Sequence, residues 1–296
     1  MNTQAGLSNL SKIFWPEEGY TKGDVIEYYD RIADYILPYL RCRPQNLNRH
    51  PNGIKKKSFF QKDVGNLPPD WVEIAKIYSV SNEKYINYMV CRDRPTLLYM
   101  VNLGCIEFYP WNARQDNIEK PDYAVIDLDP EKINFKETVK TALVVKGLLD
   151  SIKIKSFCKT SGGKGLHIFI PLGAKYHYKS IVRFTKLVGL VTRDLLPDIV
   201  SLERAHGEGQ GRIYFDYLQN NKGQTIVSAY SLRPKPGATV STPLDWSEVK
   251  PDLDPKKFNI KTIFSRLGRR GDPWQGIFDH YTDIEGAFYR LREKYL

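Results

Sequence analysis

The order of elements in the middle of the chain restricts the fold more than any other feature of this sequence. Residues 122–129 form an apolar run suited to a buried strand, and apolar residues recur at helical spacing over about 135–151 and about 178–196. Two further strand pairs, over 156–172 and 211–232, are predicted as hairpins because turn residues join them. The series strand, helix, hairpin, helix, hairpin predicts an α/β (α+β) fold whose helices cover one sheet.

The N-terminal part has a different pattern. Residues 21–40 predict a helix, with Thr21 as its cap and Asp24 at the position of an imperfect capping box. From about 45 to 110 the sequence breaks into short strand-like pieces separated by turn residues, which predicts a mainly antiparallel module. These pieces are SFFQK, IAKIYSV, YINYMV and TLLYMVNL.

No linker rich in Pro, Gly or Ser divides the 296 residues. We therefore expect a single interlocked domain over residues 1–296. Within it we distinguish an N-terminal module at 1–115, a core at 116–250, and a C-terminal helical segment at 251–296 that packs back.

The formal net charge is +10, and such an excess of Lys and Arg favours a polyanionic partner, although a merely soluble basic protein would also fit. No run of about 18 apolar residues is present, and the N-terminus lacks the apolar stretch of a signal peptide, so we expect no membrane partner. The cysteines are too irregularly spaced for a zinc site or a disulfide framework, which favours reduced thiols in the cytoplasm. They are Cys42, Cys91, Cys105 and Cys158.

Two carboxylates interrupt the apolar run PDYAVIDLDP. Because strand side chains alternate, Asp127 and Asp129 share one face, about 7 Å apart along the strand, and Pro130 is expected to end that strand at the sheet edge. Asp216 has a similar frame in GRIYFDYL, so three acids can converge if the two strands are neighbours. Three carboxylates and a substrate phosphate can hold one or two divalent cations.

Other interpretations of this acid pair remain open. Each Asp could be a solvated strand end or the partner of a basic side chain. The same spacing occurs in nucleotide-sugar transferases, and a related pair occurs in aspartyl phosphatases, although DLDPE breaks the phosphatase pattern.

The loop KTSGGKGLH has the composition of an anion cradle. Its glycines can take positive φ and turn backbone N–H groups toward a phosphate, while lysine, serine and histidine side chains add donors. It is not a P-loop, because a strand follows it, and taken alone it would be a flexible hairpin turn. The candidate triphosphate-binding residues are Ser161, Gly163, Lys164, Gly165 and His167, with Gly162 as the remaining glycine.

Further basic and aromatic residues are candidates for contacts with nucleic acid or phosphate. Arg233 could close over a terminal phosphate, or it could be an ordinary surface arginine. In RHPNGIKKKSFFQK, basic residues alternate with aromatic ones, as in surfaces that bind single strands, and we expect one Phe to point inward and one outward. The candidates for DNA binding are Lys12, Lys22, Lys55, Lys62, Phe59 and Phe60.

Taken together, these motifs resemble one family, the polymerase domain of LigD-type end-joining proteins in the archaeo-eukaryotic primase superfamily. The resemblance spans nearly the whole chain. It rests on LSNLSKIFWPEEGYTKGDVIEYY, HPNG…SFFQK, LGCIEFYPW, DYAVIDLDP, KTSGGKGLH, GRIYFDYLQN, AYSLRPKPGATVSTPLDW and GDPW, in that order. It implies a primase-like catalytic core with an RRM-like sheet.

The resemblance also implies a function, a template-directed nucleotidyltransferase that fills gaps and extends DNA ends in non-homologous end joining. It implies two divalent cations, Mn²⁺ or Mg²⁺, on Asp127, Asp129 and Asp216, a preference for ribonucleotides over deoxyribonucleotides, and Ku and a DNA ligase as partners. Lys12 and Lys22 match lysines that grip a downstream 5′-phosphate, and the Phe pair matches aromatics near the templating end. The implied location is the cytoplasm of a prokaryote, with the nucleoid.

The chain departs from the family pattern in two places. Tyr109 stands where family members often have His, and Gly163 stands where they usually have Ser. The start at Met1 and the ending AFYRLREKYL favour a stand-alone polymerase over an excised domain. Two other functions remain possible, a replicative-type primase that starts chains de novo and a non-catalytic adaptor that binds DNA ends.

Overall fold

The computed structural model describes residues 5–204 and 211–295. The chain forms two compact units, and each takes its residues from three separate segments. The first unit consists of the residues up to Asp116, Thr225–Ser241 and Lys256–Arg269. The second consists of Asn117–Gln224, Thr242–Pro255 and the residues from Arg270 onward.

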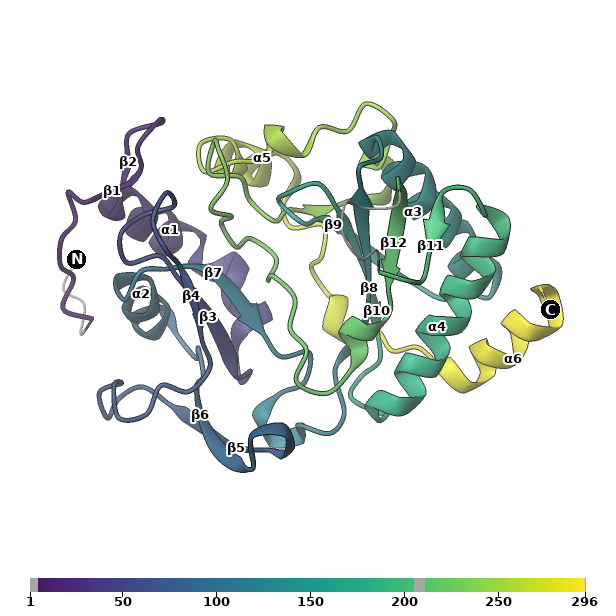
Figure 1. Ribbon diagram of the computed structural model, residues 1–296, viewed down its shortest axis with the longest axis horizontal. Coiled ribbons are helices and arrows are strands. Elements are labelled where there is room, and N and C mark those ends of the chain that lie inside the picture. The colour runs from purple at the N-terminus through teal and green to yellow at the C-terminus, as the bar shows by residue number, and fades with distance from the viewer. Residues whose placement is uncertain (1–4, 205–210, 296) are drawn as a thin grey trace. The chain divides into compact units, whose positions relative to one another are not determined.

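The predicted N-terminal helix is confirmed as α1 (Lys22–Leu40) in the first unit (Figure 1). Thr21 accepts a hydrogen bond from the backbone N–H of Asp24, and the Asp24 carboxylate accepts one from the N–H of Thr21, so the capping box is complete. Pro38 lies inside the helix, which nevertheless continues to Leu40.

The first unit contains three small antiparallel sheets. In the largest, β3 lies between β4 and β7, and the other two are the pairs β1–β2 and β5–β6. The strands are β1 (Ile13–Trp15), β2 (Tyr20–Thr21), β3 (Gln45–Arg49), β4 (Phe59–Gln61), β5 (Ile74–Ser79), β6 (Lys84–Met89) and β7 (Cys105–Pro110). The predicted antiparallel character of this region is thus confirmed.

One of the predicted strand pieces is a helix instead. TLLYMVNL lies in α2 (Arg94–Asn102), which begins with a capping hydrogen bond from the N–H of Thr96 to the Asp93 carboxylate and has a proline in its first turn. The strand prediction was wrong because the apolar side chains follow helical spacing once this cap sets the start. The buried ones are Leu97, Leu98, Met100 and Val101.

The second unit is built on a six-stranded sheet with the order β11-β12-β8-β10-β9-β13. All neighbours are antiparallel except β11 and β12, and the predicted hairpin β9–β10 is confirmed. The strands are β8 (Tyr123–Glu131), β9 (Phe157–Thr160), β10 (Leu166–Pro171), β11 (Val200–Ser201), β12 (Arg212–Asp216) and β13 (Pro243–Leu244).

Two predicted helices, α3 (Phe135–Ser151) and α4 (Tyr178–Leu195), are confirmed and cover one face of this sheet (Figure 1). The Asn134 side chain caps α3 by accepting from the N–H of Lys136. Gly189 of α4 lies so close to the sheet that an added Cβ would stand 2.9 Å from the Phe215 ring. Because Phe215 faces α4, its strand neighbours Tyr214 and Asp216 face the other side of the sheet.

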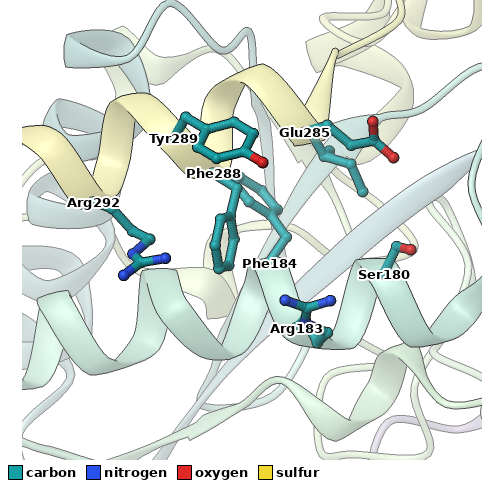
Figure 2. A pocket seen from close by; sticks show the side chains of 8 residues that line it. Ser180, Arg183, Phe184, Glu285, Phe288, Tyr289 and Arg292 are labelled. Carbon is teal, nitrogen blue, oxygen red and sulfur yellow. The ribbon is translucent and has the colours of Figure 1, made fainter.

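The C-terminal helix α6 (Ile284–Tyr295) packs on α4, on the side of α4 away from the sheet (Figure 1). Between the two helices lies a cavity of about 400 Å³ lined by aromatic and basic side chains (Figure 2). Within residues 5–204 and 211–295, the remaining helices are α5 (Ile263–Arg270) and six short 3₁₀ turns: Val80–Asn82, Gln115–Asn117, Leu218–Asn220, Trp246–Glu248, Pro255–Lys257 and Ile277–Asp279.

Two sequence expectations about the sheet were wrong. Pro130 does not end β8, which runs on to Glu131 and pairs Pro130 with Ile213. The hairpin predicted over 211–232 does not form, because β12 pairs with β8 and β11 while the second half of that hairpin belongs to the first unit. There the N–H of Ser228 donates to the Phe108 carbonyl, so distant residues satisfy the backbone of this apolar segment.

No helix among the described residues is long and apolar enough to span a bilayer. All four cysteines are free thiols, and only Cys42 is partly exposed.

Candidate active site

A row of ionisable side chains crosses the sheet of the second unit on the face opposite α3 and α4. The strand register pairs Asp216 on β12 with Asp127 on β8, Asp127 with His167 on β10, and His167 with Lys159 on β9. Directly paired residues of antiparallel strands point to the same face, so the four side chains are neighbours. The sequence predicted the faces of Asp127 and Asp216, and the register now places them side by side.

The contacts within this row fix the histidine ring. His167 Nε2 lies 3.3 Å from Asp127 Oδ1, and Lys159 Nζ lies 2.8 Å from His167 Nδ1. An ammonium group only donates, so Nδ1 accepts from Lys159, and Nε2, the ring nitrogen near Asp127, carries the proton. Lys159 was missed by the sequence analysis. Its signal was its place two residues before Ser161, in the strand that pairs with the start of LHIFIPL.

Asp216 sits where β12 turns into the 3₁₀ turn Leu218–Asn220. Its Oδ1 accepts from the N–H of Leu218 at 2.9 Å, and its Oδ2 accepts from Gln219 Nε2 at 3.1 Å. Burial and the nearby Asp216 charge raise the pKa of Tyr214, two residues earlier on this face, to about 12. Tyr214 therefore stays a neutral phenol at neutral pH.

Asn220 fixes the position of this turn. Its side-chain amide accepts from the N–H of Val125 at 2.8 Å and donates to the Val125 carbonyl at 2.7 Å. The amide thus continues the hydrogen-bonding ladder along β8 beyond the end of β12. This holds Asp216 opposite Asp127.

The carboxylates suit a divalent cation, because oxygen is the right ligand atom and the strand register places Asp127 beside Asp216. Asp127 and Asp216 are 7% and 8% exposed, while Asp129 is exposed further along β8. Carboxylate oxygens are the donors that Mg²⁺ and Mn²⁺ prefer, and two adjacent buried carboxylates repel each other unless a positive charge lies nearby. Among the residues that the structure describes, no three acidic, histidine or cysteine side chains are arranged as a ready-made metal site. Both Asp216 oxygens already accept one hydrogen bond each, from Leu218 and Gln219, and each keeps a second lone pair for a cation.

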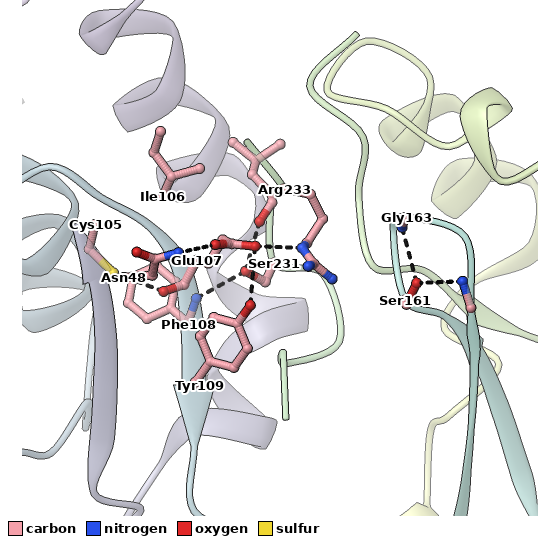
Figure 3. Close-up of polar contacts among 12 residues, drawn as sticks. Asn48, Cys105, Ile106, Glu107, Phe108, Tyr109, Ser161, Gly163, Ser231 and Arg233 are labelled. Carbon is pink, nitrogen blue, oxygen red and sulfur yellow. Dashed lines mark hydrogen bonds and ion pairs between the residues drawn. The ribbon is translucent and has the colours of Figure 1, made fainter. Parts of the chain in front are cut away.

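The glycine loop passes beside these acids. A Cβ added to Gly165 would stand 2.7 Å from the Leu128 carbonyl oxygen and 3.3 Å from Asp129 Oδ1, so only glycine allows this approach. Ser161 Oγ accepts from the N–H groups of Gly163 at 3.1 Å and Gly165 at 3.0 Å (Figure 3). Of the three loop glycines, which were all expected to be able to take positive φ, only Gly162 does so, at 72°. Lys164 is exposed at the tip.

In the first unit, Lys12 and Lys22 line one cavity of about 320 Å³, together with Arg49. Lys12 Nζ donates to Asn52 Oδ1 at 2.6 Å, and Lys22 Nζ donates to Asn102 Oδ1 at 2.7 Å. Burial and the nearby Lys12 charge lower the pKa of Lys22. Three basic groups around one small cavity suit a phosphate. Sequence reasoning did not single out Arg49.

The aromatic pair lies on β4, at the edge of the largest sheet of this unit. Phe59 is 43% exposed and Phe60 is 59% exposed, so the expectation of one inward ring was wrong. Arg49 lies over the Phe59 ring, and Phe60 packs against Tyr109 with ring centroids 5.4 Å apart. Lys62 is exposed, and Lys55 pairs with Glu17 at 2.6 Å on the surface.

Arg233, also in the first unit, is held by a buried carboxylate. Its Nε donates to Glu107 Oε1 at 2.5 Å, and the Tyr109 hydroxyl donates to the same oxygen at 3.2 Å. Figure 3 shows the Glu107 carboxylate between Arg233 and Asn48, whose amide donates to its other oxygen. Glu107 was not predicted from the sequence, and it fixes the guanidinium that was. Tyr109, which replaces the family histidine, belongs to this cluster.

Comparison with known proteins places these features in a family. The profile of the family described as "LigD, primase-polymerase domain" matches residues 21–274. The chain is 36% identical over 293 residues to the bifunctional non-homologous end joining protein LigD of Bacillus subtilis. The matched region covers 97% of this chain and 47% of that protein. It is 31% identical over 288 residues to the multifunctional non-homologous end joining protein LigD of Pseudomonas aeruginosa, covering 96% of this chain and 34% of that protein.

A solved structure has the same fold. The polymerase domain of Mycobacterium tuberculosis ligase D, determined in complex with DNA, superposes with a TM-score of 0.85 at 25% identity and covers 95% of this chain and all of that one. The α/β fold expected from the resemblance is confirmed. The chain spans about half the length of the Bacillus relative and about a third of the Pseudomonas relative.

Proposed function

The chain belongs to the family of LigD primase-polymerase domains and is therefore a nucleotidyltransferase, and from this premise we propose that it fills gaps and extends broken DNA ends in non-homologous end joining. Ribonucleotides are its preferred substrates, and Ku and a DNA ligase are its partners. The role in end joining rests on the names of the relatives, whereas the ribonucleotide preference and the two partners rest on the family resemblance alone.

One observation carries the proposed chemistry, the direct pairing of Asp127 with Asp216 on neighbouring strands. Two buried acids placed side by side repel each other unless a positive charge lies nearby, and in this row His167 lies between the basic group, Lys159, and Asp127. A divalent cation bound by both acids would supply such a charge directly. Asp129, one pleat further along the same face, stands beside the loop that ends at Gly165. The acids and the candidate anion loop therefore meet at one end of β8.

We propose that Asp127, Asp129 and Asp216 hold two divalent cations. When bound, such cations activate the primer 3′-hydroxyl and neutralise charge on the triphosphate. In the reaction the 3′-hydroxyl oxygen bonds to the α-phosphorus of the incoming nucleotide, the bond from that phosphorus to the oxygen of the β-phosphate breaks, and pyrophosphate leaves. The hydroxyl proton passes to water.

The protein's own residues orient these groups. His167 places Nε2 at 3.3 Å from Asp127 Oδ1, where the imidazole interacts electrostatically with the carboxylate, and Lys159 fixes the ring of His167. Ser161 and Gly163 shape the loop whose exposed Lys164 is placed to contact a triphosphate. Arg233 is assigned to the triphosphate because of the family resemblance. Its guanidinium donates to Glu107, and this contact fixes its orientation.

The cavity of the first unit is assigned to the 5′-phosphate of a downstream strand. Lys12 and Lys22 supply point charges, and Arg49 supplies a planar guanidinium. Phe59 and Phe60 expose ring surface on which unpaired bases can stack.

Primer extension on gapped DNA with a 5′-phosphate tests the proposal. The purified chain should add nucleotides to the primer, faster with rNTP than with dNTP, and only with Mn²⁺ or Mg²⁺ present. Asp127→Ala and Asp216→Ala should each lower the rate by at least about 100-fold, because direct ligands matter more than the outer partners whose loss costs 10- to 100-fold. Asp198→Ala, which changes an exposed acid after α4, is the matched control.

Two results would contradict this function. Synthesis on a single-stranded template without any primer would indicate a replicative-type primase. Tight binding to phosphorylated ends without any incorporation, under all metal and nucleotide conditions, would indicate a non-catalytic adaptor.

A further inference from the structure

The cavity between α4 and α6 is separate from the row of carboxylates. Its lining comes from α4 and α6, and α6 lies on the side of α4 away from the sheet (Figure 1), whereas Asp127 and Asp216 belong to the opposite face of that sheet. Its volume of about 400 Å³ suits a ligand of modest size. The side chains that matter are Ser180, Arg183, Phe184, Glu285, Tyr289 and Arg292 (Figure 2).

Aromatic rings form the floor and one wall of this cavity. Phe184 is almost fully buried at the floor, and Phe288 lies above it, with the Arg183 guanidinium 5.6 Å from its ring centroid. Tyr289 is 71% exposed, and its ring stands at 89° to that of Phe288. Because Arg183 already covers Phe288, the Tyr289 ring is the open surface on which a planar group can stack.

Positive charge surrounds these rings. Within the described part of the chain, neither Arg183 nor Arg292 pairs with a carboxylate, although both line the cavity. Lys179 and Lys186 are exposed on α4, four residues before and three residues after Arg183, so they extend the charge along the same helix face. Arg193, further along α4, differs because it is paired with Asp194 at 2.7 Å.

One end of the cavity carries an acceptor instead. Figure 2 shows the Glu285 carboxylate and the Ser180 hydroxyl at the end away from Arg292. A carboxylate beside an aromatic platform can accept a hydrogen bond from an exocyclic amino group, as glutamate does from cytosine N4. The cavity therefore combines a stacking surface, two free guanidinium groups and an acceptor for an amino group.

From this combination we propose that the α4–α6 cavity is a binding site for one nucleotide of single-stranded DNA. The base stacks on Tyr289, its amino group faces Glu285, and the phosphates on either side contact Arg183 and Arg292. Lys179 and Lys186 guide the neighbouring phosphates along α4. The inference does not depend on the polymerase reaction, because the site needs neither the carboxylates nor a cation.

Ultraviolet cross-linking of the full chain to a short oligodeoxycytidine, without divalent ions, followed by peptide mapping, reports occupancy of this cavity. We expect cross-links in α6 at or next to Tyr289, stronger with oligodeoxycytidine than with oligothymidine, which lacks the amino group. Tyr289→Ala should weaken binding about 5- to 100-fold, which is the effect of losing one base–aromatic stack. Tyr289→Phe keeps the ring and should bind as the unchanged protein does.

The salt dependence separates specific contacts from general charge. Removing two phosphate contacts by Arg183→Ala with Arg292→Ala should make the slope of log affinity against log salt shallower by about 1.4. Arg193→Ala removes the same kind of charge from the same helix outside the cavity, and should leave the slope nearly unchanged. The altered side chains are exposed, and unchanged thermal unfolding verifies that the variants fold.

Two outcomes would overturn the inference. One is that the cross-links lie elsewhere and Tyr289→Ala binds the short oligonucleotide as tightly as the unchanged chain. The other is that an added polyglutamate peptide lowers the cross-linking of α6, whereas added unlabelled oligodeoxycytidine does not. That result would assign the cavity to an acidic peptide.

Discussion

Gly165→Ala is the sharpest test of how the glycine loop serves the carboxylates, because it adds one methyl group at a defined place. The new Cβ would stand 2.7 Å from the Leu128 carbonyl oxygen, whereas ordinary contacts of this kind begin at about 3.4 Å. The loop or β8 must therefore move by roughly 0.7 Å. The residue does not have positive φ, so backbone strain adds nothing and the effect is one of contact alone.

The displacement should be costly in two ways. Overpacking of this kind typically destabilises a protein by about 1–3 kcal/mol, and each kcal/mol lowers the melting temperature of a protein of this size by about 2–4 °C. A shift approaching 1 Å next to reacting groups can lower a rate about 100-fold. We therefore expect Gly165→Ala to lower kcat/KM for nucleotide addition by about 10- to 100-fold.

Gly163→Ala is the matched control in the same loop. Its Cβ would meet only Ser161 Oγ, at 3.5 Å, which is an ordinary contact, and its N–H would still donate to that oxygen. Primer extension and thermal unfolding of both variants provide the measurement. The reasoning fails if the two variants lose the same amount of activity, or if Gly165→Ala extends primers as fast as the unchanged chain.

Two further predictions concern the first unit. Lys12→Ala combined with Lys22→Ala should weaken binding to gapped DNA by at least about 100-fold, and only when the gap carries a 5′-phosphate, since each of the two lost hydrogen bonds to a charged group contributes about 1.5–3 kcal/mol. Equal loss with and without that phosphate in a titration would point to general electrostatics. Glu107→Gln removes the buried charge that holds Arg233, and should raise KM for the nucleotide and lower the free energy of unfolding by about 1–3 kcal/mol. Glu119→Gln, which alters an exposed ion pair, is the control, and it should change the free energy of unfolding in denaturant titrations by no more than about 1 kcal/mol. Similar losses of stability in the two variants would refute a special role for Glu107.

Elements with strong local signals were predictable from the sequence. The helices α1 and α3 carry side-chain caps at Thr21 and Asn134, and α4 has a clear apolar stripe, so nearby residues determine them. Helix α2 was missed because its aromatic and apolar composition resembles a strand, and the cap at Asp93 was overlooked. The segment 225–232, which was wrongly expected to pair with β12, could not be placed from local signals. Its backbone forms hydrogen bonds with residues more than a hundred positions earlier, such as Phe108.

The candidate site divides in the same way. Alternation along a strand was enough to place Asp127 and Asp129 on one face. Register is a property of two strands, so the pairing of Asp127 with Asp216, and the presence of Lys159 in the same row, could not be read from either strand alone. The role of Glu107 could not be predicted for a related reason, since it depends on the contact with Arg233, 126 positions later in the chain.

The outward position of both phenylalanines on β4 has a consequence for how copies of this protein behave in a crowded solution. A sheet edge with two partly exposed rings can pair with the edge of another molecule, which is a common route to aggregation. This edge is only three residues long, and exposed lysines stand on both sides of it, at positions 55–57 and 62. Mutual repulsion between these lysines keeps identical chains apart while leaving the rings open to a polyanion, so the same charges that attract nucleic acid also protect solubility.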